Sequence, residues 1–134
     1  MGLKNIMDNI NKKQKQIICF DIDNTICKTP KDNNYSKSIP NKKVIHLINS
    51  LYNRGFIIKI FTARYMGRFN DDYQKTFEYG YKKTLNQMKK WKINFHSLHM
   101  GKPKIDLLID DRAINASGNW IGKLKKKIEI MDNK

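Results

Sequence analysis

Apolar residues along the chain form short continuous runs that are separated by longer stretches with helical spacing. A run of four to eight apolar residues bounded by polar or turn-forming residues is typical of a buried strand. Four segments fit this description to different degrees, and the third is the weakest: 17–22 (IICFDI), 56–62 (FIIKIFT), 95–99 and 105–110 (IDLLID). We therefore predict strands at these four places.

Helical spacing of apolar residues marks the stretches between the predicted strands. Residues 40–54 carry one such stripe, and residues from about 70 to 91 carry a second. A short amphipathic helix is also indicated within residues 1–16, and a helical tail within 120–134. Strands that alternate with helices predict an α/β fold, with a mostly parallel sheet and helices on both faces, as a single domain over residues 1–134.

Composition excludes several classes of protein. The 134 residues suit one domain, and 40% hydrophobic residues suit a folded core. No apolar run approaches the roughly 18 residues of a membrane span, and the N-terminus lacks the apolar segment of a secretory signal. Cys19 and Cys27 stand in no metal-binding spacing, so we expect reduced thiols, a cytoplasmic location and no membrane partner.

The formal net charge of +15 favours anionic ligands. The basic residues are mostly Lys, spread along the whole chain and accompanied by many Asn, which indicates a compositional bias and not a defined basic patch. We therefore disfavour nucleic acid as a partner and expect a small anionic molecule.

Polar side chains follow the predicted strands at the point where each strand ends. In an open α/β sheet, ligands bind outside the carboxyl ends of the strands. We therefore expect one edge of the sheet to gather four carboxylates, a hydroxyl and a lysine: Asp21, Asp23, Asp110, Asp111, Thr62 and Lys102.

Carboxylates packed this closely need a cation to stay ionised. Mg²⁺ fits, because it takes few carboxylates and keeps waters and phosphate oxygens, and there is no Cys or His cluster to favour zinc. A carboxylate is also a competent nucleophile toward phosphorus. These residue types indicate magnesium-assisted phosphoryl transfer.

The same residues resemble four motifs of the haloacid dehalogenase-like superfamily of phosphatases. Residues 21–25 (DIDNT) resemble the first motif, DxDxT, and Thr62, Lys102 and Asp110-Asp111 resemble the second, third and fourth, in the right order. The likeness covers residues 17–118. The phrases FTAR, FHSLHMGKP and LLIDDRAINASGNW are further similar to small cap-less phosphatases found with capsular polysaccharide biosynthesis genes.

The resemblance implies a three-layer Rossmann-like core and a role for each matching residue. Asp21 is implied to attack phosphorus and bind Mg²⁺. Asp23 is implied to act as general acid and then base, with its backbone carbonyl on the metal. Asp110 is implied to bind Mg²⁺ directly, and Asp111 to support the ion directly or through water.

Other residues are implied to hold the phosphoryl group. Thr62 is implied to hydrogen-bond a transferring oxygen, and Lys102 to balance the charge. Backbone amides near Ile22, Asp23 and Ala63 are implied to cradle the remaining oxygens.

Several of the candidate positions also have a simpler interpretation. Thr62 is also an ordinary β-branched strand residue, Lys102 a solvated charge and Asp111 a helix cap. Arg64 suits a phosphate or substrate clamp and equally a surface ion pair, and Asn24 either adjusts the hydrogen bonding of Asp23 or serves the turn.

The spacing between the motifs leaves no room for a cap domain over the site. The expected function is therefore a Mg²⁺-dependent phosphatase for a small phosphate monoester, a sugar or small-alcohol phosphate, in capsular or surface polysaccharide biosynthesis. A phosphatase acting on nucleic-acid ends and a non-catalytic binding protein on the same fold are the alternatives. The amphipathic segment in 1–16 indicates either a homo-oligomer contact or packing on the chain's own core.

Overall fold

The structure is a computed structural model, and it describes residues 2–4 and 16–132. The amphipathic helix predicted within residues 1–16 therefore falls almost entirely outside the described residues. The chain divides into two compact units, Met1–Lys104 and Ile105–Lys134, and each is described here by itself.

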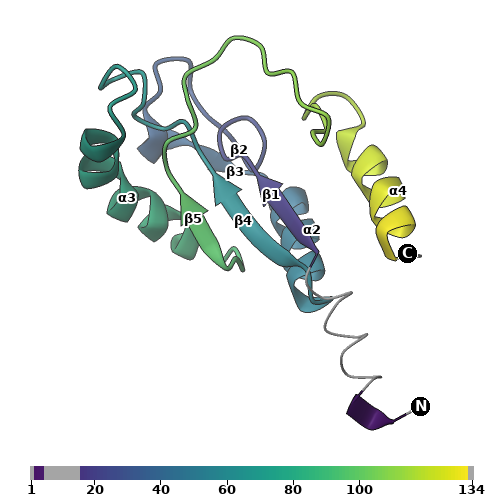
Figure 1. The fold of residues 1–134 in the computed structure, drawn as a ribbon. Helices are drawn as coiled ribbons and strands as arrows, with labels where there is room; N and C mark the ends of the chain where they lie inside the picture. Colours follow the sequence, from purple (N-terminus) through teal and green to yellow (C-terminus); the bar gives the residue numbers. More distant parts are fainter. Residues whose placement is uncertain (1, 5–15, 133–134) are drawn as a thin grey trace. The chain divides into compact units, whose positions relative to one another are not determined.

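The first unit is built on a three-stranded parallel sheet (Figure 1). The strands are β1 (Ile17–Phe20), β4 (Ile57–Phe61) and β5 (Ser97–His99), in the spatial order β1-β4-β5. Phe20 pairs with Ile60, and Ile60 pairs with Leu98. Strands were predicted at all three places, and the parallel arrangement is confirmed.

Two helices connect these strands, as the helical spacing predicts. They are α2 (Lys42–Asn53) and α3 (Tyr73–Lys90). The Asn41 side chain caps α2 by accepting from the backbone N–H groups of Lys43 and Val44, and Asp72 caps α3 by accepting from the N–H of Lys75. Both caps satisfy amides that a helix N-terminus leaves without partners.

The core of the first unit lies on one face of the sheet. Both crossovers connect parallel neighbours in the same direction, and right-handed crossovers then place α2 and α3 on the same face. Asn49 on α2 accordingly hydrogen-bonds the backbone at Lys92 and Asn94, just after α3. The buried apolar residues of this face include Phe20, Val44, Ile48, Leu51, Ile58, Ile60, Met88 and Leu98.

The opposite face of the sheet is more exposed. Ile17 is 52% exposed and Phe61 is 36% exposed. Helices on both faces were predicted, but the described α-helices between the strands of the first unit lie on one side. The three-layer arrangement therefore stays a prediction.

A small flap connects β1 to α2. It holds the two-residue strands β2 (Cys27–Lys28) and β3 (Ile39–Pro40), which pair antiparallel, and the short 3₁₀ helix η1 (Tyr35–Lys37). These short elements fill the segment between β1 and α2, which leaves no space in it for a cap domain.

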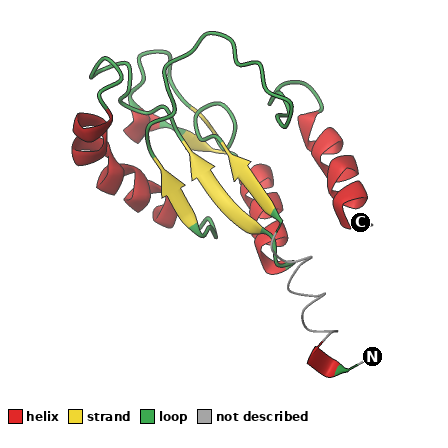
Figure 2. Cartoon of the chain, in the orientation of Figure 1, coloured by secondary structure: helices red, strands yellow, loops and turns green. Residues whose placement is uncertain are grey.

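The second unit corrects one prediction. The strand predicted at 105–110 is absent, and residues 101–119 have neither helix nor strand; Figure 2 shows this segment as loop. Leu107 is 80% exposed and Ile109 is 90% exposed. A strand needs a neighbouring backbone to accept its hydrogen bonds, and an apolar run alone does not provide one. The predicted C-terminal helix is present as α4 (Trp120–Asp132), with Leu124 and Ile128 buried.

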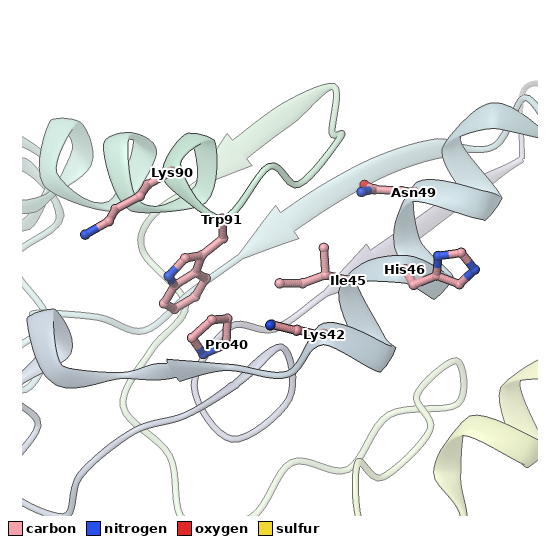
Figure 3. A pocket seen from close by; sticks show the side chains of 7 residues that line it. All are labelled: Pro40, Lys42, Ile45, His46, Asn49, Lys90 and Trp91. Atoms are coloured by element: carbon pink, nitrogen blue, oxygen red, sulfur yellow. The ribbon is translucent and has the colours of Figure 1, made fainter.

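A surface hollow of about 400 Å³ lies between α2 and the end of α3 (Figure 3). No residue that the sequence marks for chemistry lines it; its lining is Pro40, Lys42, Ile45, His46, Asn49, Lys90 and Trp91. Among the described residues, no helix combines the length and the apolar character that crossing a membrane demands.

Gly80 on α3 gives a test of the packing. A Cβ atom added to Gly80 would come closer than 3.0 Å to the Tyr65 ring, and Tyr65 holds a positive φ of 68°. Helix propensity alone favours Gly80→Ala by about 1 kcal/mol, but overpacking costs about 1–3 kcal/mol. We expect a net decrease in the free energy of unfolding, measured by urea denaturation.

The matched control is Lys82→Ala, an exposed position on the same helix, which we expect to change the free energy of unfolding by less than about 0.5 kcal/mol. A Gly80→Ala variant that is more stable than the natural protein would show that the Tyr65 ring moves aside at no cost.

Candidate active site

The carboxyl ends of β1, β4 and β5 bring three segments of the first unit together. Asp21 follows β1, Thr62 follows β4, and Lys102 follows β5 by three residues. The Lys102 ammonium lies 3.6 Å from Asp21 Oδ1, and the Lys102 backbone N–H donates to the Thr62 carbonyl at 3.1 Å. The structure thus places these three residues at one edge of the sheet, where the sequence predicted them.

Asp21 is a partly buried carboxylate that lies beside the ammonium group of Lys102. Its side chain is 34% exposed, and the Thr25 hydroxyl donates to Oδ2 at 3.4 Å. Burial raises the pKa of Asp21, while Lys102 and a hydrogen bond from the Ile22 backbone act in the opposite direction. Burial is the largest of these effects.

A tight turn after β1 fixes the position of Asp21 relative to Asp23. The Ile22 carbonyl accepts from the N–H groups of Thr25 and Ile26, and the Ile22 side chain is fully buried. Asn24 adopts a positive φ of 61°, which Asn tolerates better than most residues. Its side-chain oxygen accepts from the Thr29 N–H at 3.3 Å, so in this structure Asn24 serves the turn.

The guanidinium group of Arg64 forms an ion pair with the Asp23 carboxylate. Arg64 Nη2 donates to Oδ1 at 2.9 Å, and Arg64 Nε donates to Oδ2 at 3.0 Å and to Oδ1 at 3.2 Å. This is the forked arrangement that arginine makes with carboxylates. The Arg64 side chain is 1% exposed and the Asp23 side chain 22% exposed, so most of this ion pair is buried inside the protein.

Arg64 is itself fixed from two further directions. Its Nη1 donates to Gln87 Oε1 on α3 at 2.5 Å, and its guanidinium carbon lies 4.6 Å from the centre of the Tyr35 ring in the flap. Gln87 Nε2 in turn donates to the Tyr35 carbonyl at 2.8 Å. Of the two interpretations of Arg64, the structure shows the ion pair, but in a buried place and not at the surface.

The flap supplies another donor to Asp23. The Thr29 hydroxyl donates to Asp23 Oδ1 at 2.5 Å, and it also lies 2.9 Å from the buried Ser38 hydroxyl. The Cys27 thiol approaches the same oxygen at 3.8 Å, and burial raises the pKa of this thiol. These flap residues were not predicted as part of the site.

Thr62 and Ala63 directly precede Arg64 in the chain. Thr62 is fully buried, and its hydroxyl oxygen accepts from the Arg64 N–H at 3.1 Å. Ala63 is partly exposed and follows directly after it. The segment that carries the second motif therefore also sets the backbone direction at Arg64.

The remaining predicted ligands belong to the second unit. Asp110 Oδ1 accepts from the Arg112 N–H at 2.7 Å, and Asp111 lies 3.9 Å from the Arg112 guanidinium with 89% of its side chain exposed. No helix follows Asp111 directly, so the structure gives it no helix to cap.

The donor chemistry of the first unit suits a hard cation. In the described part of the chain, no three His, Cys, Asp or Glu side chains gather into a group that could hold a metal ion. Mg²⁺ commonly uses one or two carboxylates, with waters and substrate phosphate oxygens in the other positions. The partly exposed Asp21 carboxylate, destabilised by burial, fits this need as one member of such a donor set.

The sequence reasoning missed the residues that orient Asp23. Thr29, Tyr35, Ser38 and Gln87 are common polar residues in a flap and on a helix, and none forms a motif with Asp23. Thr25 was visible as the last position of DxDxT. Gln87 is 64 positions from Asp23 along the chain, and no local pattern links the two residues.

Comparison with solved structures shows the fold. No known protein family and no curated protein matches the sequence. A crystal structure of an MCSG target from Vibrio cholerae is similar, with a TM-score of 0.75 and 22% sequence identity over 88% of this chain and 97% of that chain. The two proteins therefore share a small α/β fold.

Two more distant likenesses involve larger chains. They come from two structures of a Pnkp1/Rnl/Hen1 complex, one of them described as an RNA repair complex. The TM-scores are 0.48 and 0.45, at 17% and 16% identity over 87% and 84% of this chain. This chain spans about a third of their length, 34% and 31%.

The raised pKa of Asp21 predicts a pH-dependent effect on stability. Because the pKa of folded Asp21 lies above its unfolded value, ionisation destabilises the folded state as pH rises through that interval. Asp21→Asn keeps the shape and removes the charge. In metal-free buffer we expect Asp21→Asn to be more stable than the natural protein at neutral pH, and the difference to shrink toward pH of about 3.9, the ordinary Asp value.

Urea denaturation of both proteins across this pH range measures the effect. A constant difference between the two proteins at every pH would show that burial does not govern the ionisation of Asp21. Asp32→Asn, at an exposed flap carboxylate, is the matched control.

Proposed function

We propose that this protein is a Mg²⁺-dependent phosphatase that hydrolyses a small phosphate monoester through an aspartyl-phosphate on Asp21. The observation that carries the proposal is the division between two carboxylates on one turn. Asp21 lies beside Lys102 with part of its surface exposed, while Asp23 is held by Arg64 and Thr29. Two carboxyl groups in different environments are suited to different chemical roles.

In the first step, an Asp21 oxygen attacks phosphorus. The bond from phosphorus to the ester oxygen breaks, and the leaving alkoxide takes a proton from Asp23 and departs as the alcohol. In the second step, water attacks the same phosphorus and gives a proton to Asp23. The bond between phosphorus and Asp21 breaks, inorganic phosphate leaves, and both carboxyl groups return to their starting states.

The surrounding groups neutralise and orient charge. Lys102 is close enough to Asp21 to offset negative charge on the incoming phosphoryl group. Backbone N–H groups of Asp23 and Ala63, with that of Ile22, and the Thr62 hydroxyl are the proposed donors to its oxygens. A bound Mg²⁺ would supply further charge neutralisation, with Asp21, the Asp23 carbonyl, Asp110 and Asp111 as its proposed protein ligands.

The proposed substrate is a sugar or small-alcohol phosphate, and the proposed setting is capsular or surface polysaccharide biosynthesis in the cytoplasm. The small flap and the absence of space for a cap between the motifs support a site without a covering domain. The similarity of FTAR, FHSLHMGKP and LLIDDRAINASGNW to cap-less phosphatases supports the setting.

Replacement of the nucleophile tests the reaction. We expect the purified protein to release phosphate from p-nitrophenyl phosphate only with Mg²⁺, and Asp21→Asn to lower kcat by on the order of 10³-fold or more, because the amide cannot form the aspartyl-phosphate. Asp32→Asn, which removes a flap carboxylate outside the site, should retain full activity. Full activity in Asp21→Asn would contradict the assignment of the nucleophile.

Asp110 tests the metal assignment. Asp110→Asn removes one of the proposed ligand charges, so we expect the Mg²⁺ concentration for half-maximal activity to rise by at least roughly tenfold. Excess Mg²⁺ should restore part of the activity. Asp106→Asn, at an exposed carboxylate four residues earlier, is the matched control. An unchanged Mg²⁺ dependence in Asp110→Asn would remove Asp110 from the ligand set.

A further inference from the structure

We propose that Arg64 is the positioning residue that orients Asp23 as the general acid, and that Gln87 and Tyr35 hold Arg64 for this purpose. The inference rests on the proposed function and goes beyond it, because it assigns a task to residues outside the four motifs. Arg64 would then act through Asp23 and not by binding the phosphoryl group.

The two oxygens of Asp23 have different surroundings. Oδ1 accepts from Arg64 Nη2 at 2.9 Å, from Thr29 Oγ1 at 2.5 Å and from Arg64 Nε at 3.2 Å. Within the described residues, Oδ2 accepts from Arg64 Nε alone, at 3.0 Å. A carboxylate oxygen offers about two lone pairs, so Oδ1 is fully engaged. Oδ2 is therefore the oxygen with capacity to exchange a proton with a leaving group.

The guanidinium is held too firmly to swing between Asp23 and a substrate. It is 1% exposed, it donates to Gln87 on α3, and it lies against the Tyr35 ring. A planar fork with several donors fixes both the position and the plane of a carboxylate. Burial without solvent access also argues against direct contact with a phosphate monoester.

Lysine cannot reproduce this arrangement. Its ammonium keeps the positive charge but is a single point without the planar fork. Arg64→Lys therefore preserves the charge balance at Asp23 while releasing the orientation of the carboxyl plane. Gln87→Met keeps the arginine at position 64 and removes the hydrogen bonds that Gln87 makes to Arg64 and to the Tyr35 carbonyl.

Substrates with different leaving groups distinguish a loss of acid positioning from general structural damage. An alkoxide needs a proton as it departs, whereas p-nitrophenolate is stable enough to leave without one. General acid catalysis contributes about 10²–10⁴-fold where it is needed. Loss of acid orientation should therefore slow an alkyl phosphate much more than p-nitrophenyl phosphate.

The experiment measures kcat and KM with Mg²⁺ on p-nitrophenyl phosphate and on a simple alkyl phosphate such as glycerol phosphate. We expect Arg64→Lys to lose at least roughly tenfold more kcat on the alkyl substrate than on the aryl one, with KM little changed. Gln87→Met should show the same pattern more weakly. Asp23→Asn provides the reference for complete loss of the acid.

Arg68→Lys is the matched control. Arg68 is an exposed arginine four residues later, stacked on the Tyr79 ring, and its replacement should affect both substrates equally or neither. Circular dichroism and thermal unfolding show whether each variant is folded. If Arg64→Lys does not fold, the comparison of substrates in Gln87→Met decides the matter.

Two results would overturn the inference, and they are distinguishable. A natural protein without Mg²⁺-dependent activity on either substrate would overturn the proposed function and this inference with it. An active natural protein whose folded Arg64→Lys or Gln87→Met variant loses equal activity on both substrates, or loses none, would overturn the positioning role alone.

Discussion

The parallel pairing of β4 with β1 on one side and with β5 on the other determines where the residues of the first unit's candidate site lie. Because Phe20, Ile60 and Leu98 are in register, the three strands end at nearly the same level. Asp21, Thr62 and Lys102 then enter the same space, although they are up to 81 positions apart in the sequence. Buried apolar side chains on the helix-covered face stabilise the pairing, so the site depends on this core.

Two separate cations offset the two carboxylates of the turn after β1. Asp21 faces the Lys102 ammonium, whose side chain is 22% exposed, and Asp23 faces the almost fully buried Arg64. Burying an ion pair costs desolvation energy that only good geometry and additional hydrogen bonds recover. Gln87, Thr29 and the Tyr35 ring supply those contacts around Arg64 and Asp23. The more exposed pair thus involves the proposed nucleophile, and the more buried pair the proposed acid.

Much of the first unit could be predicted from the sequence because its signals are local. Continuous apolar runs mark β1 and β4, and helical spacing marks α2 and α3, with Asn41 and Asp72 as caps. The apolar run 105–110 has the same appearance, yet it forms no strand, because pairing depends on a partner that the run does not contain. The ion pair between Asp23 and Arg64 and the contact to Gln87 are equally nonlocal. The ion pair joins the segments that follow the paired strands β1 and β4, and the contact to Gln87 also needs α3 in its place.

The flap contributes to the site in a way that its short length does not suggest. Thr29 reaches Asp23, and the Tyr35 carbonyl and ring are bound to Gln87 and Arg64. The flap is held by contacts at both Thr29 and Tyr35. Moving it away would break hydrogen bonds that orient Asp23. In the proposed reaction, the position of the flap and proton transfer by Asp23 would therefore be coupled through the same contacts. If the proposed reaction is correct, a change in the flap that admits a different alcohol would also move Asp23, the group that we propose protonates this alcohol.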